Sequence, residues 1–212
     1  MLPTEIPLFP LPNVVLFPAA LLPLHVFEPR YRAMVADALE NERLIGMVML
    51  RPGWEPDYEG TPAVYRIGCA GFITHAEPLP DGRYNIMLRG LEKFRIVEER
   101  FARDGVQRYR MARVESLKEP PRASSGAAAE ARRRLEQVIA KRLHRNPDDT
   151  IPKDIPDNDL IHAIAQHLEP LEKQALLECD GVLERYRRLL SILDFRQLER
   201  ARPAGPSEPT VH

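Results

Sequence analysis

Few side chains in this sequence could act as nucleophiles, and none lies near a base at a useful spacing. Cys69 lies in the apolar run GCAG, which is typical of a small buried side chain. The serines fall in proline-rich or charged segments, whereas nucleophilic catalysis needs an activating base and a fixed oxyanion site. An enzymatic function survives only if folding joins His75 with Glu77 or Asp81.

Cofactor and metal motifs do not fit the sequence either. None of the eleven glycines is followed by lysine, so the chain has no phosphate-binding loop that ends in Gly-Lys-Ser/Thr. His162 and His167 are the closest histidine pair, but they are five residues apart, and ligands on one helical face need a spacing of three or four. We therefore predict no catalytic residue, no cofactor and no metal site.

Arginine runs are the feature that most resembles a nucleic-acid surface. They occupy residues 132–134 and 185–188 of the expected helices. Neighbouring residues on a helix point in different directions, and Glu130, Glu136 and Glu184 are interspersed, so a solvated face with ion pairs within the helix is the favoured interpretation. The net charge of −1 also argues against recruitment of nucleic acid or anionic membrane. RNA binding is kept as the alternative function.

Composition places the chain among globular cytoplasmic proteins. Of 212 residues, 44% are hydrophobic and 29% charged, and the two cysteines are far apart, which fits a reducing compartment. The apolar stretch 14–27 is short for a bilayer span and contains Pro18 and Pro23. The first charge is Glu5, so no basic segment precedes this stretch as it would in a signal peptide.

The stretch 64–99 predicts a three-stranded antiparallel meander around which the N-terminal part is built. Asp81-Gly82 is a favoured hairpin pair, and Gly90 marks a second bend or bulge. Before the meander, Glu28-Pro29 is a helix start. The remaining strands of a small, partly closed barrel are expected at 5–9, 14–17, 24–27, 44–50 and 107–117.

The second part of the chain has helical periodicity. Apolar residues recur at helical spacing in four segments, which begin near residues 131, 158, 170 and 182. The run KEPPRASSG is the best boundary candidate. We predict an α+β protein with a β-rich domain at 1–118, a linker at 119–126, a helical bundle at 127–201 and a disordered tail at 202–212.

Four ordered blocks carry a family resemblance. They are PLFPLPNVVLFP at 7–18, PLHVFEPRYRAM at 23–34, the meander at 67–96, and LEKQALLECDGVLERYRRLLSIL at 171–193. Together they resemble the Lon protease N-terminal (substrate-binding) domain family over residues 5 to 195. The resemblance implies a PUA-like β pseudo-barrel with one helix, followed by a four-helix bundle. Within this family, the chain resembles the stand-alone bacterial proteins that carry this domain without an ATPase P-loop or a Ser-Lys protease domain.

This resemblance implies a non-catalytic protein- or peptide-binding module, an adaptor or recognition protein in proteolysis or protein quality control. Its expected partners are unfolded or flexible polypeptide segments and a separate protease. Candidate peptide contacts are Trp54 and Tyr58 in a loop, with Phe27 and Tyr31 at a strand–helix junction. The competing interpretations are core packing for Phe27 and Tyr31 and a loop anchor for Trp54.

Overall fold

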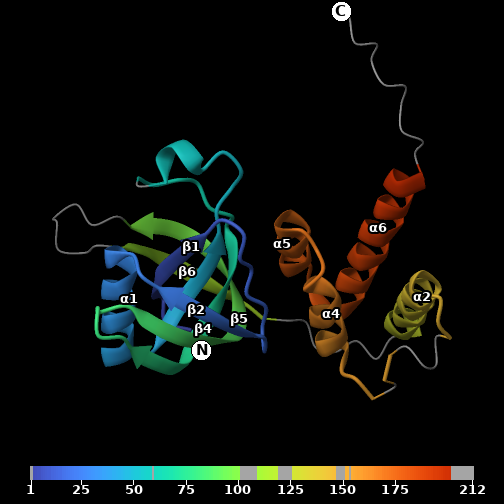
Figure 1. Cartoon of the computed structure of the whole chain (residues 1–212), viewed down its shortest axis with the longest axis horizontal. Coiled ribbons are helices and arrows are strands. Elements are labelled where there is room, and N and C mark those ends of the chain that lie inside the picture. Colours follow the sequence, from blue (N-terminus) through green and yellow to red (C-terminus); the bar gives the residue numbers. More distant parts are fainter. Residues whose placement is uncertain are drawn as a thin grey trace, which may run out of the picture. The chain divides into compact units, whose positions relative to one another are not determined.

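The chain forms two compact units, Met1–Glu119 with Ala165–Glu178, and Pro120–Ile164 with Cys179–His212 (Figure 1). This computed structural model describes residues 2–58, 60–100, 109–118, 126–146, 151–152 and 154–201. The predicted tail at 202–212 and residues 119–125 of the predicted linker lie outside the described residues. The predicted domain limits stay predictions.

The first unit is built on a six-stranded sheet that closes on itself. Its strands run in the order β2-β5-β4-β3-β1-β6, and β5 also pairs with β6, which closes a ring of five strands and leaves β2 outside it. β1 and β3 are parallel and the other pairs are antiparallel. The expected pseudo-barrel is therefore confirmed. The strands are β1 (Glu5–Leu11), β2 (Leu21–Val26), β3 (Leu44–Met49), β4 (Ile67–Pro78), β5 (Tyr84–Arg100) and β6 (Arg110–Leu117).

β5 corrects the predicted meander. It is one strand of 17 residues, where two strands separated at Gly90 were expected. Its first half pairs with β2 and its second half with β6, while β4 pairs along both halves. The register against β4 shifts between Cys69 and Gly71, opposite Gly90, so of the two expected alternatives the structure has a bulge and not a bend between two strands. A Cβ on Gly90 would lie 2.0 Å from the carbonyl oxygen of Phe17, which explains the glycine.

The strand expected at 14–17 does not form. Leu16 and Phe17 are buried, but their backbone runs without regular pairing into a turn in which Ala20 N–H donates to the Phe17 carbonyl at 3.1 Å. Prolines at 12 and 18 border this segment, and proline cannot donate to a strand ladder. The segment thus belongs to the core without forming a strand.

One helix, α1 (Pro29–Glu40), packs against the sheet. It begins with proline at its first turn, as predicted, and buries Tyr31, Met34, Val35 and Ala38. The Tyr31 ring lies 4.4 Å from the Phe9 ring of β1, centroid to centroid. A separate buried cluster joins the strands to one another and includes Ile6, Leu8, Val48, Phe94 and Ile96.

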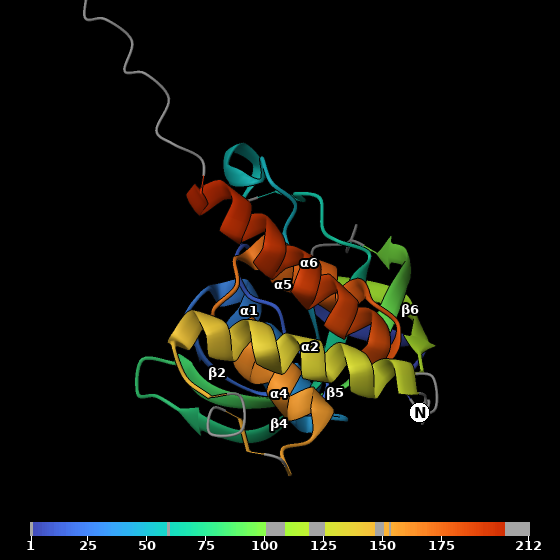
Figure 2. The ribbon, with the colours of Figure 1, turned by 90° about the vertical axis from the view of Figure 1, so that its right-hand side faces the viewer.

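Four helices follow the sheet in the described part of the chain, as expected for the α+β class. α2 (Gly126–Leu143), α4 (Asp157–Ala165) and α6 (Gly181–Ala201) make up most of the second unit, and α2 crosses α6 (Figure 2). α5 (Pro170–Glu178) belongs to the first unit. Its buried Gln174 donates from Nε2 to the carbonyl oxygen of Ile67 at 3.0 Å, which ties α5 to the start of β4.

Candidate functional site

A row of exposed side chains lies along β2, the strand outside the closed ring. Leu21, Pro23 and His25 point to one face because side chains alternate along a strand, and all three are exposed. Phe27 extends the spacing of two, and its ring is stacked on that of His25 at 6.2 Å. Leu21 and Phe27 are 63% and 60% exposed, which is unusual for large apolar side chains only six residues apart on one face.

A shallow groove continues this row across the sheet. The register places Pro23 beside Met87 of β5, and Met87 beside His75 of β4. These residues line a hollow of about 420 Å³ together with Leu24, His25, Asn85 and Ile86. We call the surface formed by Leu21, Pro23, His25, Phe27, His75 and Met87 the β2 face.

Polar groups form one border of the β2 face. His25 Nδ1 and Asn85 Oδ1 are 2.8 Å apart, and Asn85 Nδ2 donates to a Glu77 carboxylate oxygen at 3.0 Å. Asp81 forms an ion pair with Arg83 at 2.6 Å, and backbone and side-chain hydrogen bonds from Arg83 lower the pKa of Asp81. Both carboxylates that could have activated His75 are thus engaged with other residues.

The predicted loop aromatics lie at a different place in the first unit. Trp54 and Tyr58 flank a short 3₁₀ helix, Glu55–Asp57, and their rings meet edge to face at 5.3 Å. Both are half-buried and pack against the buried cluster of the strands. This geometry fits a loop anchored to the barrel, with part of each ring still open to solvent.

Hydrogen bonds among Glu28, Arg30 and Tyr58, which we call the clasp, fix this loop to the start of α1. Tyr58 Oη donates to Glu28 Oε1 at 2.5 Å, and Arg30 Nε donates to Glu28 Oε2 at 2.9 Å. The Arg30 guanidinium lies 4.7 Å from the Tyr31 ring and 5.0 Å from the Tyr58 ring, so it is held between two aromatic faces. Partial burial raises the pKa of the Tyr58 phenol, and its hydrogen bond to Glu28 raises it further.

The four predicted contacts therefore fall into two groups. The clasp brings together Trp54, Tyr58 and Tyr31, but Tyr31 is only 4% exposed and serves the core. Phe27 lies on the β2 face and offers its ring to solvent. The sequence analysis did not identify Leu21, Pro23, His25 and Met87 as contacts and named His75 only as an enzymatic candidate. Apolar or aromatic residues at 21, 23, 25 and 27 were the available signal.

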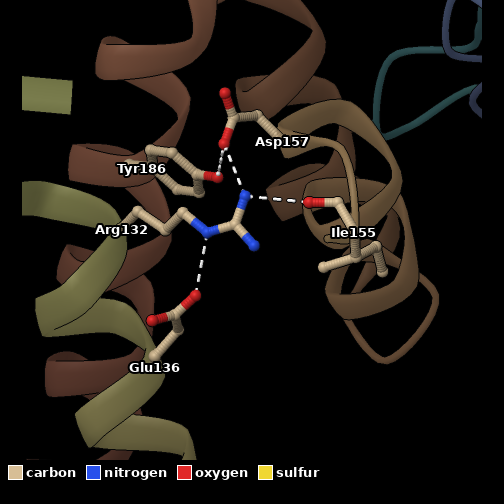
Figure 3. A network of polar contacts seen from close by, with 5 residues as sticks. All are labelled: Arg132, Glu136, Ile155, Asp157 and Tyr186. Carbon is tan, nitrogen blue, oxygen red and sulfur yellow. Dashed lines mark hydrogen bonds and ion pairs between the residues drawn. The ribbon is translucent and has the colours of Figure 1, made fainter. Parts of the chain in front are cut away.

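The arginine run in α2 is occupied by ion pairs. Arg132 donates to Glu136, to the Ile155 carbonyl and to Asp157, which also accepts from the Tyr186 hydroxyl (Figure 3). Arg133 pairs with Glu130 within the helix, and Arg134 lies 3.9 Å from Asp194. Of the three, Arg132 links α2 to other parts of the second unit, whereas the pairs of Arg133 and Arg134 are exposed.

The described residues contain neither a cluster of metal ligands nor a membrane-spanning helix. No group of three or more His, Cys, Asp and Glu side chains is close enough to hold a metal ion in that part of the chain. Within the same residues, no helix has both the length and the apolar character that crossing a membrane requires.

Residues 5–194 match the family profile described as the ATP-dependent protease La (LON) substrate-binding domain. The chain belongs to this family. The Lon protease of Cytophaga hutchinsonii is 28% identical over 205 residues, which cover 91% of this chain and 24% of that protein. Lon protease 2 of Herpetosiphon aurantiacus is 32% identical over 200 residues, which cover 89% of this chain and 23% of the relative. The chain thus spans about a quarter of the length of the curated relatives that it matches.

Solved structures of the family agree with the fold. A Lon N-terminal domain protein from Xanthomonas campestris superposes with a TM-score of 0.61 at 25% identity, over 89% of this chain and 98% of that one. The N-terminal domain of a Mycobacterium avium complex Lon protease gives a TM-score of 0.63 at 17% identity, over 90% and 98% of the two chains. The latter likeness concerns the fold alone.

Proposed function

We propose that this protein is a non-catalytic module that binds unfolded or flexible polypeptide segments, and that the β2 face is its contact surface. The observation that carries the proposal is the exposed apolar row on β2, in a chain that belongs to a substrate-binding domain family. Burial of such side chains stabilises a complex by roughly 25 cal/mol per Å² of apolar area. In the cell the module would act as an adaptor that presents polypeptides to a separate protease.

The β2 face also has the composition of a site that discriminates little between sequences. Met87 is flexible and polarizable, and Pro23 and Leu21 offer apolar surface without directional hydrogen bonds. The polar border formed by Asn85 and Glu77 lies along one side of the groove. Trp54 and Tyr58 are proposed as a second contact for longer segments, since part of each ring is open.

Fluorescence anisotropy with a labelled 12-residue peptide of alternating leucine and serine tests the proposal. Binding to the 212-residue chain is expected, and the double variant Leu21→Ser/Phe27→Ser should weaken it at least about tenfold. Leu198→Ser is the matched control, because Leu198 is 69% exposed but lies on α6. Equal affinity of the double variant and the control would contradict the location, and absence of binding by the wild type would contradict the function.

A further inference from the structure

We propose that the partner segment binds by strand addition, as a further β-strand on the outer edge of β2. This inference rests on the proposed function, because it specifies how the polypeptide is held. Its basis is the backbone of β2 and not only the side chains of the β2 face. Among the described residues, β2 pairs with β5 alone, and it is the strand that the closed ring leaves out.

The position of Pro23 decides which backbone groups face outward. Opposed residues in an antiparallel pair alternate between hydrogen-bonded and non-hydrogen-bonded positions. Pro23 is opposed to Met87 and has no N–H, so this pair is of the non-hydrogen-bonded kind. Leu21 and His25, two residues to either side, have the same orientation. Their N–H and C=O groups, and the Pro23 carbonyl, therefore point away from β5.

A contact next to β2 supports this assignment independently. Gly90 N–H donates to the Ala20 carbonyl at 2.9 Å, so Ala20 is turned toward β5. The residues at even positions, Leu22 and Leu24, continue that orientation, and those at odd positions face outward. In the described part of the first unit, no backbone hydrogen bond joins another segment to this outer edge.

The outer edge thus presents two donors and three acceptors with the period of a β-strand. An extended polypeptide is the partner whose own groups repeat with the same period, which is the basis of strand addition. Side chains on one face of the added strand would lie beside Leu21, Pro23 and His25 and extend the apolar row. The missing donor at Pro23 leaves the edge incomplete, as in natural edge strands that avoid pairing with each other.

Selective N-methylation of the peptide tests the backbone ladder directly. A methyl group on a peptide amide that faces β2 removes one hydrogen bond and adds a clash, whereas a methyl group on the next amide points to solvent. A scan along the 12-residue leucine–serine peptide should give losses of at least about fivefold at every second amide within the bound stretch. Equal effects at neighbouring amides would overturn strand addition and leave the proposed function intact.

Hydrogen exchange and a matched pair of variants give a second measurement. With the peptide bound, the Leu21 and His25 amides should exchange at least about tenfold more slowly, while those of Leu22 and Leu24, already bonded to β5, should not change. His25→Pro removes an outward donor and should bind at least about fivefold more weakly than His25→Ala, which keeps that donor. Unchanged exchange at Leu21 and His25 with peptide bound, or equal affinities of the two variants, would also overturn the inference. No binding at all would overturn both proposals.

Discussion

The hydroxyl group of Tyr58 donates a 2.5 Å hydrogen bond to the carboxylate of Glu28, 30 residues earlier in the chain. The same carboxylate accepts from Arg30, whose guanidinium in turn donates to the Tyr58 carbonyl at 3.3 Å. A loop that has little regular structure is therefore fixed to the first turn of α1 at both its side chain and its backbone. This explains how two large aromatics can occupy a loop rich in proline and glycine.

Tyr58→Phe should weaken this clasp without changing the ring contacts. We expect a loss of about 0.5–1.5 kcal/mol in the free energy of unfolding, because one hydrogen bond to a partly buried carboxylate disappears. Trp54 is the single tryptophan and touches the Tyr58 ring, so its fluorescence in urea titrations reports on this loop. Tyr65→Phe is the control, and an equal loss in that variant would contradict the clasp.

Gly90→Ala should be far more damaging than an ordinary Gly→Ala change in a strand, because Gly90 is buried. The added Cβ would meet the Phe17 carbonyl oxygen at 2.0 Å, and that oxygen belongs to a backbone already bonded to Ala20. We expect the free energy of unfolding to fall by at least about 2 kcal/mol, or the variant to fail to fold. Gly126→Ala, where a Cβ has open space, is the control, and thermal unfolding followed by circular dichroism compares the two. Similar midpoints would refute the steric account.

Much of the fold was predictable because its signals are local. The hairpin at Asp81-Gly82, the helix start at Pro29 and the helical apolar spacings each depend on a few neighbouring residues, and all three features are present in the structure. What the sequence did not predict is non-local. Whether Gly90 ends a strand or lets it pass beneath Phe17 depends on a segment more than 70 residues away, which no local pattern encodes.

The candidate site was predicted only in part for the same reason. Phe27 was identified as an aromatic at a strand–helix junction, but the groove needs Met87, which the sheet register places beside Pro23, and His75, which it places beside Met87. Likewise, the hydrogen bond between Gln174 of α5 and Ile67 of β4 joins residues 107 positions apart, which helix periodicity does not predict. Strand register and helix docking are fixed by packing across the sheet and not by residue type.

Arg132→Ala should destabilise the second unit. Arg132 bridges α2 to Asp157, which also binds Tyr186, so its loss leaves a half-buried carboxylate short of a cation (Figure 3). We expect the free energy of unfolding to fall by about 1–3 kcal/mol. This is below the range for fully buried pairs, because 18% of the Arg132 side chain is exposed. Arg133→Ala is the adjacent control, and its exposed pair with Glu130 should contribute less than about 0.5 kcal/mol. Equal losses in urea unfolding would contradict the bridging role.

His162 gives the stability of the second unit a pH dependence. Burial lowers its pKa below 6.5, and the nearby Arg185 lowers it further, while Asp159 acts in the opposite direction. In the unfolded chain this histidine takes up a proton as the pH falls through about 6.5, but in the folded chain it does so only at lower pH. Between these two values the unfolded state binds more protons, so the free energy of unfolding decreases as the pH falls.

Replacement of His162 by glutamine should therefore flatten this dependence. Urea unfolding should be measured between about pH 7.5 and 5, a range that includes the ordinary pKa of histidine. As the pH falls, the free energy of unfolding should decrease less in the variant than in the wild type. His167→Gln changes a histidine five residues later, after the end of α4 and in the first unit, and serves as the control for the effect of the substitution itself. A wild-type slope that persists in His162→Gln would show that other groups carry the pH dependence, and that burial of the imidazole beside Arg185 does not control it.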